Sequence, residues 1–333
     1  MQRTITYEID KQGAGRDIRG FLRAQGYSRH ILAHIKPLAH AVLVNGKHEL
    51  LRYELKEGDR LQITIEDEAP SAHVIPAPVP FRVAYEDEDL LVIDKPAGVS
   101  IHPAPGHPAD TLANGLAHYY EQQGIPFVFR CINRLDRDTT GLLIVAKNLI
   151  SASILEQALQ AHAIRRTYLA LAEGEMTGTG TVDLPIARKE GSLIERCVDE
   201  SGDRAVTHYR LAAPEELLSS LPANGFAGKA DPFFADLPAT PLILNLETGR
   251  THQIRVHMAA IGHPLLGDSL YNPRWAALYE KGVPTPGATL PLGLGRQALH
   301  SWKLEFSHPV TKRPMRFIAP VPEDLVSILY SLS

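Results

Sequence analysis

Cysteine is nearly absent from this 333-residue chain, which contains only Cys131 and Cys197. Two cysteines cannot form a disulfide framework, and the N-terminus lacks a basic-then-apolar signal, so a reducing cytoplasm is the expected location. No segment approaches the ~20 apolar residues that a membrane helix needs, and no membrane association is expected. Cys131 lies among apolar and aromatic neighbours (FVFRCINRL), which favours a small buried residue over a nucleophile.

Motifs for cofactors and metals are also missing. The chain has no Gly-x-Gly-x-x-Gly and no Gly-Lys-Ser/Thr loop, so no nucleotide cofactor is expected. His252, His257 and His263 lie close together in sequence, but no cysteine or carboxylate completes a recognisable zinc spacing. On a strand, His252 and His257 would point to opposite faces. We interpret all three as hydrogen-bonded histidines and expect no metal.

Basic residues are not in excess, because the formal net charge is -4. The distribution is uneven: residues 1–66 hold 11 Lys and Arg against 8 Asp and Glu, whereas the remainder holds 23 against 30. RNA binding depends on the local field of a basic groove more than on total charge. The total therefore neither supports nor excludes RNA.

The length allows one large domain and a small one, and the sequence divides accordingly. Residues 1–66 predict a small α/β domain, and residues 67–80, with four prolines and little that could pack, predict an extended linker. The elements expected within residues 1–66 are strands at 4–9 and 60–66, helices at 16–24 and 28–38 with Ser28 as N-cap, and a strand that enters an Asn45-Gly46 turn.

Residues 81–333 alternate irregularly between strands and a few helices, which predicts an α+β domain with a largely antiparallel mixed sheet. Residues 213–240 are rich in Ala, Pro and Gly and predict a surface insertion. Strands are expected at FRVAYE, LLVIDK, GLLIVAK, TYLALAE, LILNLE and HQIRVHM, and helices at 111–122, at 150–162 and from Pro322 onward.

The densest polar cluster is NRLDRDTTG at 133–141, directly before an apolar strand. Gly141 would let the chain turn tightly into that strand. Asp136, between Arg134 and Arg137, would stay ionised and could act as a nucleophile or a general base. Alternatively, this segment is a solvated turn whose charges pair among themselves.

A second cluster, THQIRVHM, supplies a cation that would match this carboxylate. Read as a strand, it places Ile254 on an apolar face and Arg255 on the opposite face, toward a cleft. Burial of a guanidinium is costly unless a carboxylate meets it, so we expect an Asp136–Arg255 pair. Tyr168 is either an ordinary strand aromatic or a residue that stacks on a base removed from its helix.

Residues 133–147 (NRLDRDTTGLLIVAK) closely resemble the HRLD-x-x-TSG-LLLLAK signature of the RluA-type pseudouridine synthases. Residues 16–66 are similar to the S4 RNA-binding module that often precedes this catalytic domain. Further blocks resemble family motifs in the same order, at YEDEDLLVIDKPAGVSIHP, RTYLALAEG, GDRAVTHYR, LETGRTHQIRVHMAAIGHPLLGD and ALHSWKLEFSHPVTKRPMRF.

The resemblance implies isomerisation of uridines to pseudouridine in structured RNA, without a cofactor. It matches Asp136 to the catalytic aspartate, Tyr168 to the tyrosine that packs on the target uracil, and Arg255 to the arginine that pairs with the aspartate. It also matches Arg134 to an arginine that fills the gap left by the flipped nucleotide, and Ile254 to an apolar pocket position. The family usually has His, Ser and Lys where this chain has Asn133, Thr140 and Arg166.

The expected substrate is large-subunit ribosomal RNA, with transfer RNA as the alternative, and the expected state is a monomer. Two other functions remain open. The chain could bind RNA without catalysis, with RLDRD contacting phosphates, or it could be a hydrolase that uses Asp136 and Asp138 as paired carboxylates.

Overall fold

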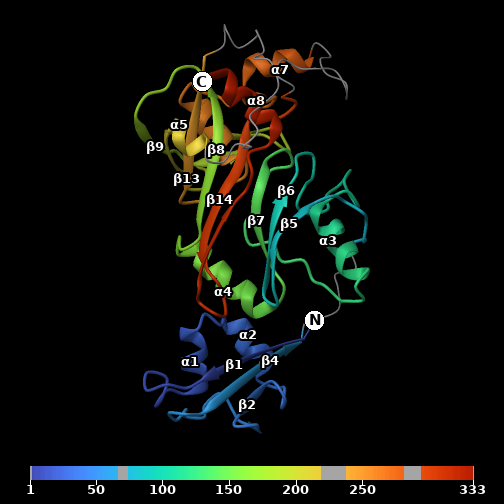
Figure 1. Cartoon of the computed structure of the whole chain (residues 1–333), viewed down its shortest axis with the longest axis vertical. Coiled ribbons are helices and arrows are strands. Elements are labelled where there is room, and N and C mark those ends of the chain that lie inside the picture. Colours follow the sequence, from blue (N-terminus) through green and yellow to red (C-terminus); the bar gives the residue numbers. More distant parts are fainter. Residues whose placement is uncertain (1, 67–73, 219–237, 281–293, 333) are drawn as a thin grey trace.

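The computed structural model describes residues 2–66, 74–218, 238–280 and 294–332. They form a small N-terminal domain below a large mixed sheet, with helix α4 (Leu149–Gln160) between them (Figure 1). Within these ranges no helix combines the length and the apolar character needed to cross a membrane.

The N-terminal domain has the elements that the sequence predicts. Ser28 Oγ accepts a hydrogen bond from Ile31 N at 3.3 Å, which confirms the predicted N-cap. Asn45 and Gly46 both have positive φ, as a type I′ hairpin turn requires. In spatial order its sheet is β1 (Gln2–Glu8), β4 (Arg60–Glu66), β2 (Val42–Val44) and β3 (Lys47–His48), and its helices are α1 (Ile18–Ala24) and α2 (Arg29–Ile35).

The large sheet has nine strands, and among the described pairings all but one are antiparallel, as the sequence predicts. The exception is β14, which pairs in parallel with β7 and separates it from β8. The spatial order is β5 (Arg82–Glu86), β6 (Leu90–Lys95), β7 (Thr140–Ala146), β14 (Leu299–Ser307), β8 (Arg165–Glu173), β13 (Ala239–Leu246), β12 (Val206–Leu211) and β9 (Thr179–Asp183), with β15 (Pro314–Ile318) on β14.

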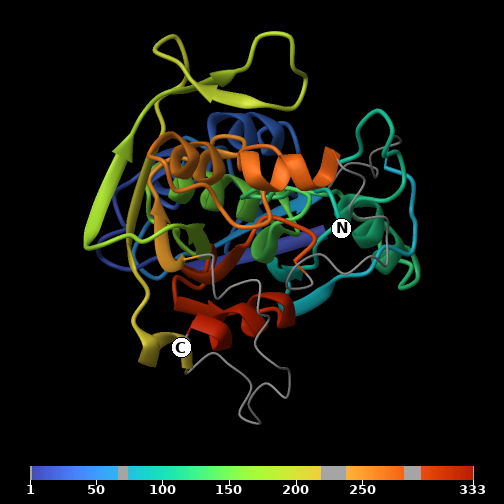
Figure 2. The same ribbon diagram turned by 90° about the horizontal axis from the view of Figure 1, so that it is seen from above.

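Side chains alternate along the strands, so both faces of this sheet carry apolar residues, and helices cover both faces. Tyr168 of β8 packs in a core cluster with helix α3 (Leu112–Glu121), whereas its neighbour Leu169 packs with the C-terminal helix α8 (Glu323–Leu332). The remaining elements are α5 (Pro214–Leu218), α6 (Gln253–Ala260), α7 (Pro273–Glu280), and the ribbon of β10 (Ile186–Arg188) and β11 (Arg196–Val198), which projects from the body (Figure 2).

The strand predicted at HQIRVHM is wrong, because Gln253–Ala260 form helix α6. Residues 253 to 258 are all buried, so no exposed side reveals the helical period, and Ile254 and Val256 have strand-forming side chains. A short element that is buried on every side cannot be assigned by periodicity alone.

The described part of the predicted linker, residues 74–80, is extended but packs on the large C-terminal domain, contrary to expectation. Asn114 of α3 donates its Nδ2 to Ile75 O at 2.7 Å, and Val79 packs against the main core. The predicted insertion at 213–240 includes α5 and the start of β13, and its residues 219–237 lie outside the described ranges.

Gly141 has a φ of +103°, and a Cβ atom there would lie 2.2 Å from Ser301 O, at the parallel pairing of β7 with β14. Gly141→Ala is expected to lower the free energy of unfolding by about 3 kcal/mol, from left-handed strain plus the backbone clash. Gly262→Ala is the matched control, because Gly262 has a φ of +86° and open space around its Cβ position. Its expected cost is about 1 kcal/mol. Equal losses in urea denaturation would contradict the close-approach explanation.

Candidate active site

A cleft of about 770 Å³ opens at the ends of the central strands. Three chain segments form most of its wall, residues 100–104, 132–137 and 246–254, together with side chains from β8. Four of the five predicted site residues line it, namely Arg134, Asp136, Tyr168 and Ile254. The fifth, Arg255, reaches the cleft through its contact with Asp136.

Asp136 lies in the loop that precedes β7, and its side chain is 21% exposed. Two buried side chains anchor this loop to the sheet. Asn133 Oδ1 accepts a hydrogen bond from Ile144 N at 2.9 Å, and Lys95 Nζ donates to Arg137 O at 2.7 Å. The carboxylate is therefore held at the cleft by a fixed loop and remains accessible to a ligand.

Tyr168 and Ile254 supply the apolar part of the cleft. Tyr168 lies on β8, opposite Leu244 of β13 and Ser301 of β14, and both Tyr168 and Ile254 are 4% exposed. Burial raises the pKa of Tyr168, so its hydroxyl stays protonated at neutral pH. The two side chains belong to the same core cluster, which limits their freedom to move.

Arg255 is buried and bridges two carboxylates from its position on α6. Its Nη1 lies 3.5 Å from Asp136 Oδ2, so the predicted pair is present. Its closer partner is Asp268, which accepts from Nε at 2.7 Å and from Nη2 at 2.8 Å. Burial alone would lower the pKa of Arg255, but the hydrogen bonds and charge of Asp268, with the charge of Asp136, raise it.

Asp268 is the site residue that sequence reasoning missed. It is fully buried, and its Oδ1 also accepts hydrogen bonds from Leu270 N and Tyr271 N at 3.0 and 3.2 Å. The Tyr271 ring lies 5.0 Å below the Arg255 guanidinium and completes its enclosure. The need for a second carboxylate could have been inferred from the sequence, because one partly exposed carboxylate does not compensate the charge of a buried arginine.

The cleft has a local excess of positive charge, although the whole chain is negative. Its lining includes two carboxylates, Asp136 and Glu247, and four arginines: Arg134, Arg137, Arg166 and Arg250. Such a surface attracts a polyanion despite the net charge of -4.

The histidines of the second cluster are hydrogen-bonded to protein groups, as predicted. His252 Nδ1 lies 2.8 Å from Tyr271 Oη, His257 contacts Thr207 and Leu184, and His263 contacts Glu173 O. Cys131 is apart from the chemistry, because burial raises the pKa of its thiol to about 12.

The three departures from the family signature have clear structural roles. Asn133 caps a strand amide, as described above, and Thr140 Oγ1 lies 2.8 Å from His300 Nδ1. Arg166 donates its Nη2 to Thr248 O at 3.2 Å and so supports the loop before α6. Each of these three side chains therefore stabilises the strands or the loop around the cleft.

The sequence profile of the RNA pseudouridylate synthase family matches residues 89–260, a range that contains Asp136, Tyr168 and Arg255. The chain belongs to this family. An uncharacterised RNA pseudouridine synthase of Bacillus subtilis, YjbO, is 39% identical over 91% of this chain and 95% of its own length. Ribosomal large subunit pseudouridine synthase D of Escherichia coli K12 is 38% identical over 86% of this chain and 81% of its own length.

The fold agrees with this assignment. The solved structure of human RNA pseudouridylate synthase domain containing 1 aligns with a TM-score of 0.51 at 24% identity, covering 73% of this chain and 84% of that one. This RNA pseudouridine synthase is therefore an isomerase with the α+β fold expected from its sequence.

Asp138 does not line the cleft of the synthase. Its Oδ1 accepts a hydrogen bond from Gly98 N at 3.1 Å, and its carbonyl accepts from Arg296. A hydrolase that uses Asp136 and Asp138 as a pair would need both carboxylates at the same substrate bond. The geometry does not favour that alternative.

His300, which contacts Thr140 next to the loop that carries Asp136, predicts a specific pH dependence of stability. Burial, with the nearby charge of Arg296, lowers the pKa of His300 to about 3, whereas an unfolded histidine titrates near pH 6.5. Between these values the unfolded chain binds more protons, so stability is lost as the pH falls below about 6.5. At pH 5 the loss is expected to be about 2 kcal/mol from this residue. Denaturation of His300→Gln should show a shallower slope over pH 5–7, and identical slopes would contradict the prediction.

Proposed function

We propose that this synthase converts specific uridines of large-subunit ribosomal RNA to pseudouridine, with Asp136 as the catalytic carboxylate. The observation that carries the proposal is the contact of Asp136 with buried Arg255 in a cleft whose apolar wall includes Tyr168 and Ile254. The names of ribosomal relatives support the substrate, and transfer RNA is the alternative.

The reaction breaks the bond from C1′ to N1 and forms a bond from C1′ to C5. C5 releases its proton and N1 takes one up, so the composition of the nucleotide is unchanged. Asp136 would act at the sugar, either by attacking C1′ or by removing a sugar proton to give a glycal. Arg255 would orient the Asp136 carboxylate through their contact. Tyr168 and Ile254 would hold the detached uracil so that it turns and rejoins without escaping.

The target base has to leave its stack before Asp136 can reach the sugar, at a cost of a few kcal/mol. Arg134 is exposed at the cleft, and we assign it to the gap that the flipped nucleotide leaves in the RNA. The three exposed arginines of the lining, Arg134, Arg137 and Arg250, fit an RNA backbone. The N-terminal domain is proposed to be an S4-like RNA-binding module, in a monomeric cytoplasmic protein.

Transcribed large-subunit RNA with tritium at uridine C5 tests the function. Isomerisation releases tritium, a hydrolase frees uracil, and a protein that only binds RNA does neither. Tritium release with ribosomal RNA and none with transfer RNA is the expected result. Tritium release with transfer RNA alone would identify transfer RNA as the substrate in place of ribosomal RNA. Release of free uracil would overturn the proposed isomerisation.

A further inference from the structure

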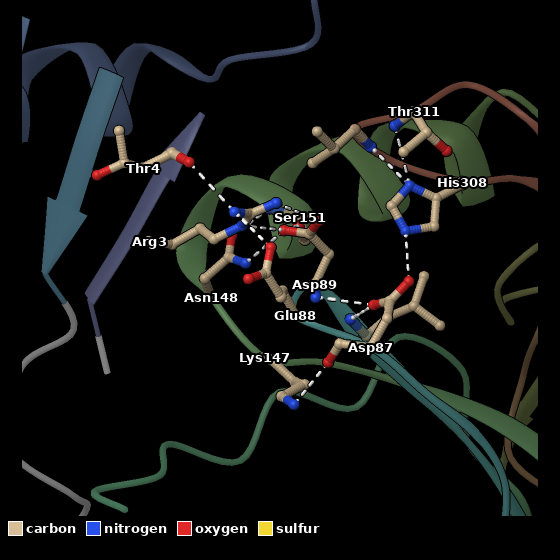
Figure 3. A network of polar contacts seen from close by, with 12 residues as sticks. Arg3, Thr4, Asp87, Glu88, Asp89, Lys147, Asn148, Ser151, His308 and Thr311 are labelled. Atoms are coloured by element: carbon tan, nitrogen blue, oxygen red, sulfur yellow. Dashed lines mark hydrogen bonds and ion pairs between the residues drawn. The ribbon is translucent and has the colours of Figure 1, made fainter. Parts of the chain in front are cut away.

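An ion pair between a partly buried arginine and a buried aspartate holds the N-terminal domain against the catalytic domain. Arg3 of β1 donates from Nε and Nη2 to both oxygens of Asp89, at 2.9 and 2.8 Å (Figure 3). Asp89 is 2% exposed and also accepts hydrogen bonds from Asn148 and Ser151 at the start of α4. A bidentate pair with a buried carboxylate is costly to separate, so the docking has a defined geometry.

A second contact lies two turns further along α4. Gln157 Nε2 and Ser153 Oγ both donate to Gly26 O, at 2.7 and 3.2 Å. Ile154 packs so closely on Gly26 that a Cβ atom at residue 26 would meet it at 3.0 Å. Because both contacts use α4, this helix fixes the loop between α1 and α2 relative to the cleft.

The two domains enclose a hollow of about 410 Å³ at this junction. The N-terminal domain contributes residues 23 and 27–29 to its lining, and α4 contributes Ser153, Glu156, Gln157 and Gln160. Gln160 also lines the catalytic cleft. The hollow and the cleft therefore meet at the C-terminal end of α4.

Positive charge dominates the side of the hollow that the N-terminal domain supplies. Arg23 and Arg29 are exposed, and neither is paired with another residue in the part of the chain that the structure describes. They face one carboxylate, Glu156. A guanidinium group presents a planar fork of N–H donors that fits two phosphate oxygens.

We propose that this hollow binds backbone phosphates of the RNA strand that continues from the target nucleotide, through Arg23 and Arg29. The inference rests on the proposed function, because it extends the same RNA from the cleft along α4. Ser153 to Gln160 span about 10 Å of helix, roughly the length of three stacked nucleotides. The fixed docking makes the N-terminal domain part of one continuous substrate surface.

Binding is tested in Asp136→Asn protein, so that catalysis plays no part. Arg23→Glu with Arg29→Glu is expected to weaken binding of protein-free large-subunit RNA by tenfold or more. The slope of log affinity against log salt should fall by about 1 to 2, since each lost phosphate contact removes about 0.7 to 0.9. Lys47→Glu with Arg52→Glu is the control, because it makes the same charge change at exposed residues outside the hollow. Equal losses in both variants would overturn the proposal.

A length series in the active protein separates this site from the cleft. With an oligonucleotide trimmed close to the target uridine, Arg23→Glu with Arg29→Glu should lose little kcat/KM for tritium release. With RNA extended on both sides, it should lose tenfold or more, mainly through KM. A loss that is independent of RNA length would refute the assignment. Absence of tritium release from the unmodified protein would instead refute the proposed function. The binding comparison would still show whether the hollow binds RNA.

Discussion

Asp136→Asn is expected to reduce tritium release by about 1,000-fold or more, while RNA binding survives. An amide can neither attack C1′ nor accept a sugar proton, and the loss of a general base or nucleophile has this order of effect. The fold should persist, because Arg255 keeps its two hydrogen bonds to Asp268. Single-turnover release and filter binding on the same RNA give the two measurements.

Asp138→Asn is the matched control for this variant. It makes the same change two residues away, at a carboxylate outside the cleft lining, and the amide oxygen can still accept from Gly98 N. We expect its turnover to stay within about tenfold of the unmodified enzyme, well short of the loss expected for a catalytic carboxylate. Near-normal turnover in Asp136→Asn, or an equal loss in both variants, would refute the role given to Asp136.

Asp268→Asn is expected to lower both stability and turnover. Neutralising one partner of a buried pair costs about 3–5 kcal/mol. Here it leaves Asp136, at 3.5 Å, as the charged partner of Arg255, while the amide oxygen of the new side chain can keep one of the two hydrogen bonds. The guanidinium would then move toward Asp136, and a displacement of about 1 Å at a reacting group costs about 100-fold in rate. Because Asp268 does not line the cleft, the loss should appear in kcat more than in KM.

Asp324→Asn separates this positioning effect from a general loss of stability. Asp324 accepts a similar bidentate pair from Arg296, at 2.7 and 2.9 Å, and neither residue lines the cleft. Both variants should denature at lower urea concentrations, but under folding conditions Asp268→Asn should have the much lower kcat. Equal values of kcat in the two variants would show that Asp268 has only a structural role. Asp268→Glu, which keeps the charge, should recover part of the turnover.

Local signals in the sequence predicted local structure well. Ser28 as an N-cap, the Asn45-Gly46 turn and the turn with positive φ at Gly141 each depend on the local backbone, and each is confirmed. Helix α6 was misassigned because its surroundings bury every side, so the period that identifies a helix is hidden. Tertiary packing, which the local sequence does not encode, decided that element.

The candidate site shows the same division. Asp136 and Arg255 could be paired from the sequence because a buried cation needs an anion, and the family motif indicated which anion. The stronger partner, Asp268, is the last residue of the family-like block LETGRTHQIRVHMAAIGHPLLGD, 13 residues after Arg255, but no local pattern in the sequence indicates that it is buried against a guanidinium. The packing of residues 74–80 on α3 was hidden for a related reason, since the hydrogen bond from Asn114 is to the backbone carbonyl of Ile75 and depends on no side chain of the segment.

The position of β14 in the sheet has a consequence for synthesis of the enzyme. Asp136 precedes β7, Tyr168 lies on β8, and β14 separates these two strands although it comes last in the sheet's main path. A growing chain that has reached residue 290 already contains every proposed catalytic side chain, yet its sheet is still two unjoined halves. The ribosome therefore has to finish almost the whole polypeptide before the two halves of the sheet can join, and we expect shorter products not to modify RNA.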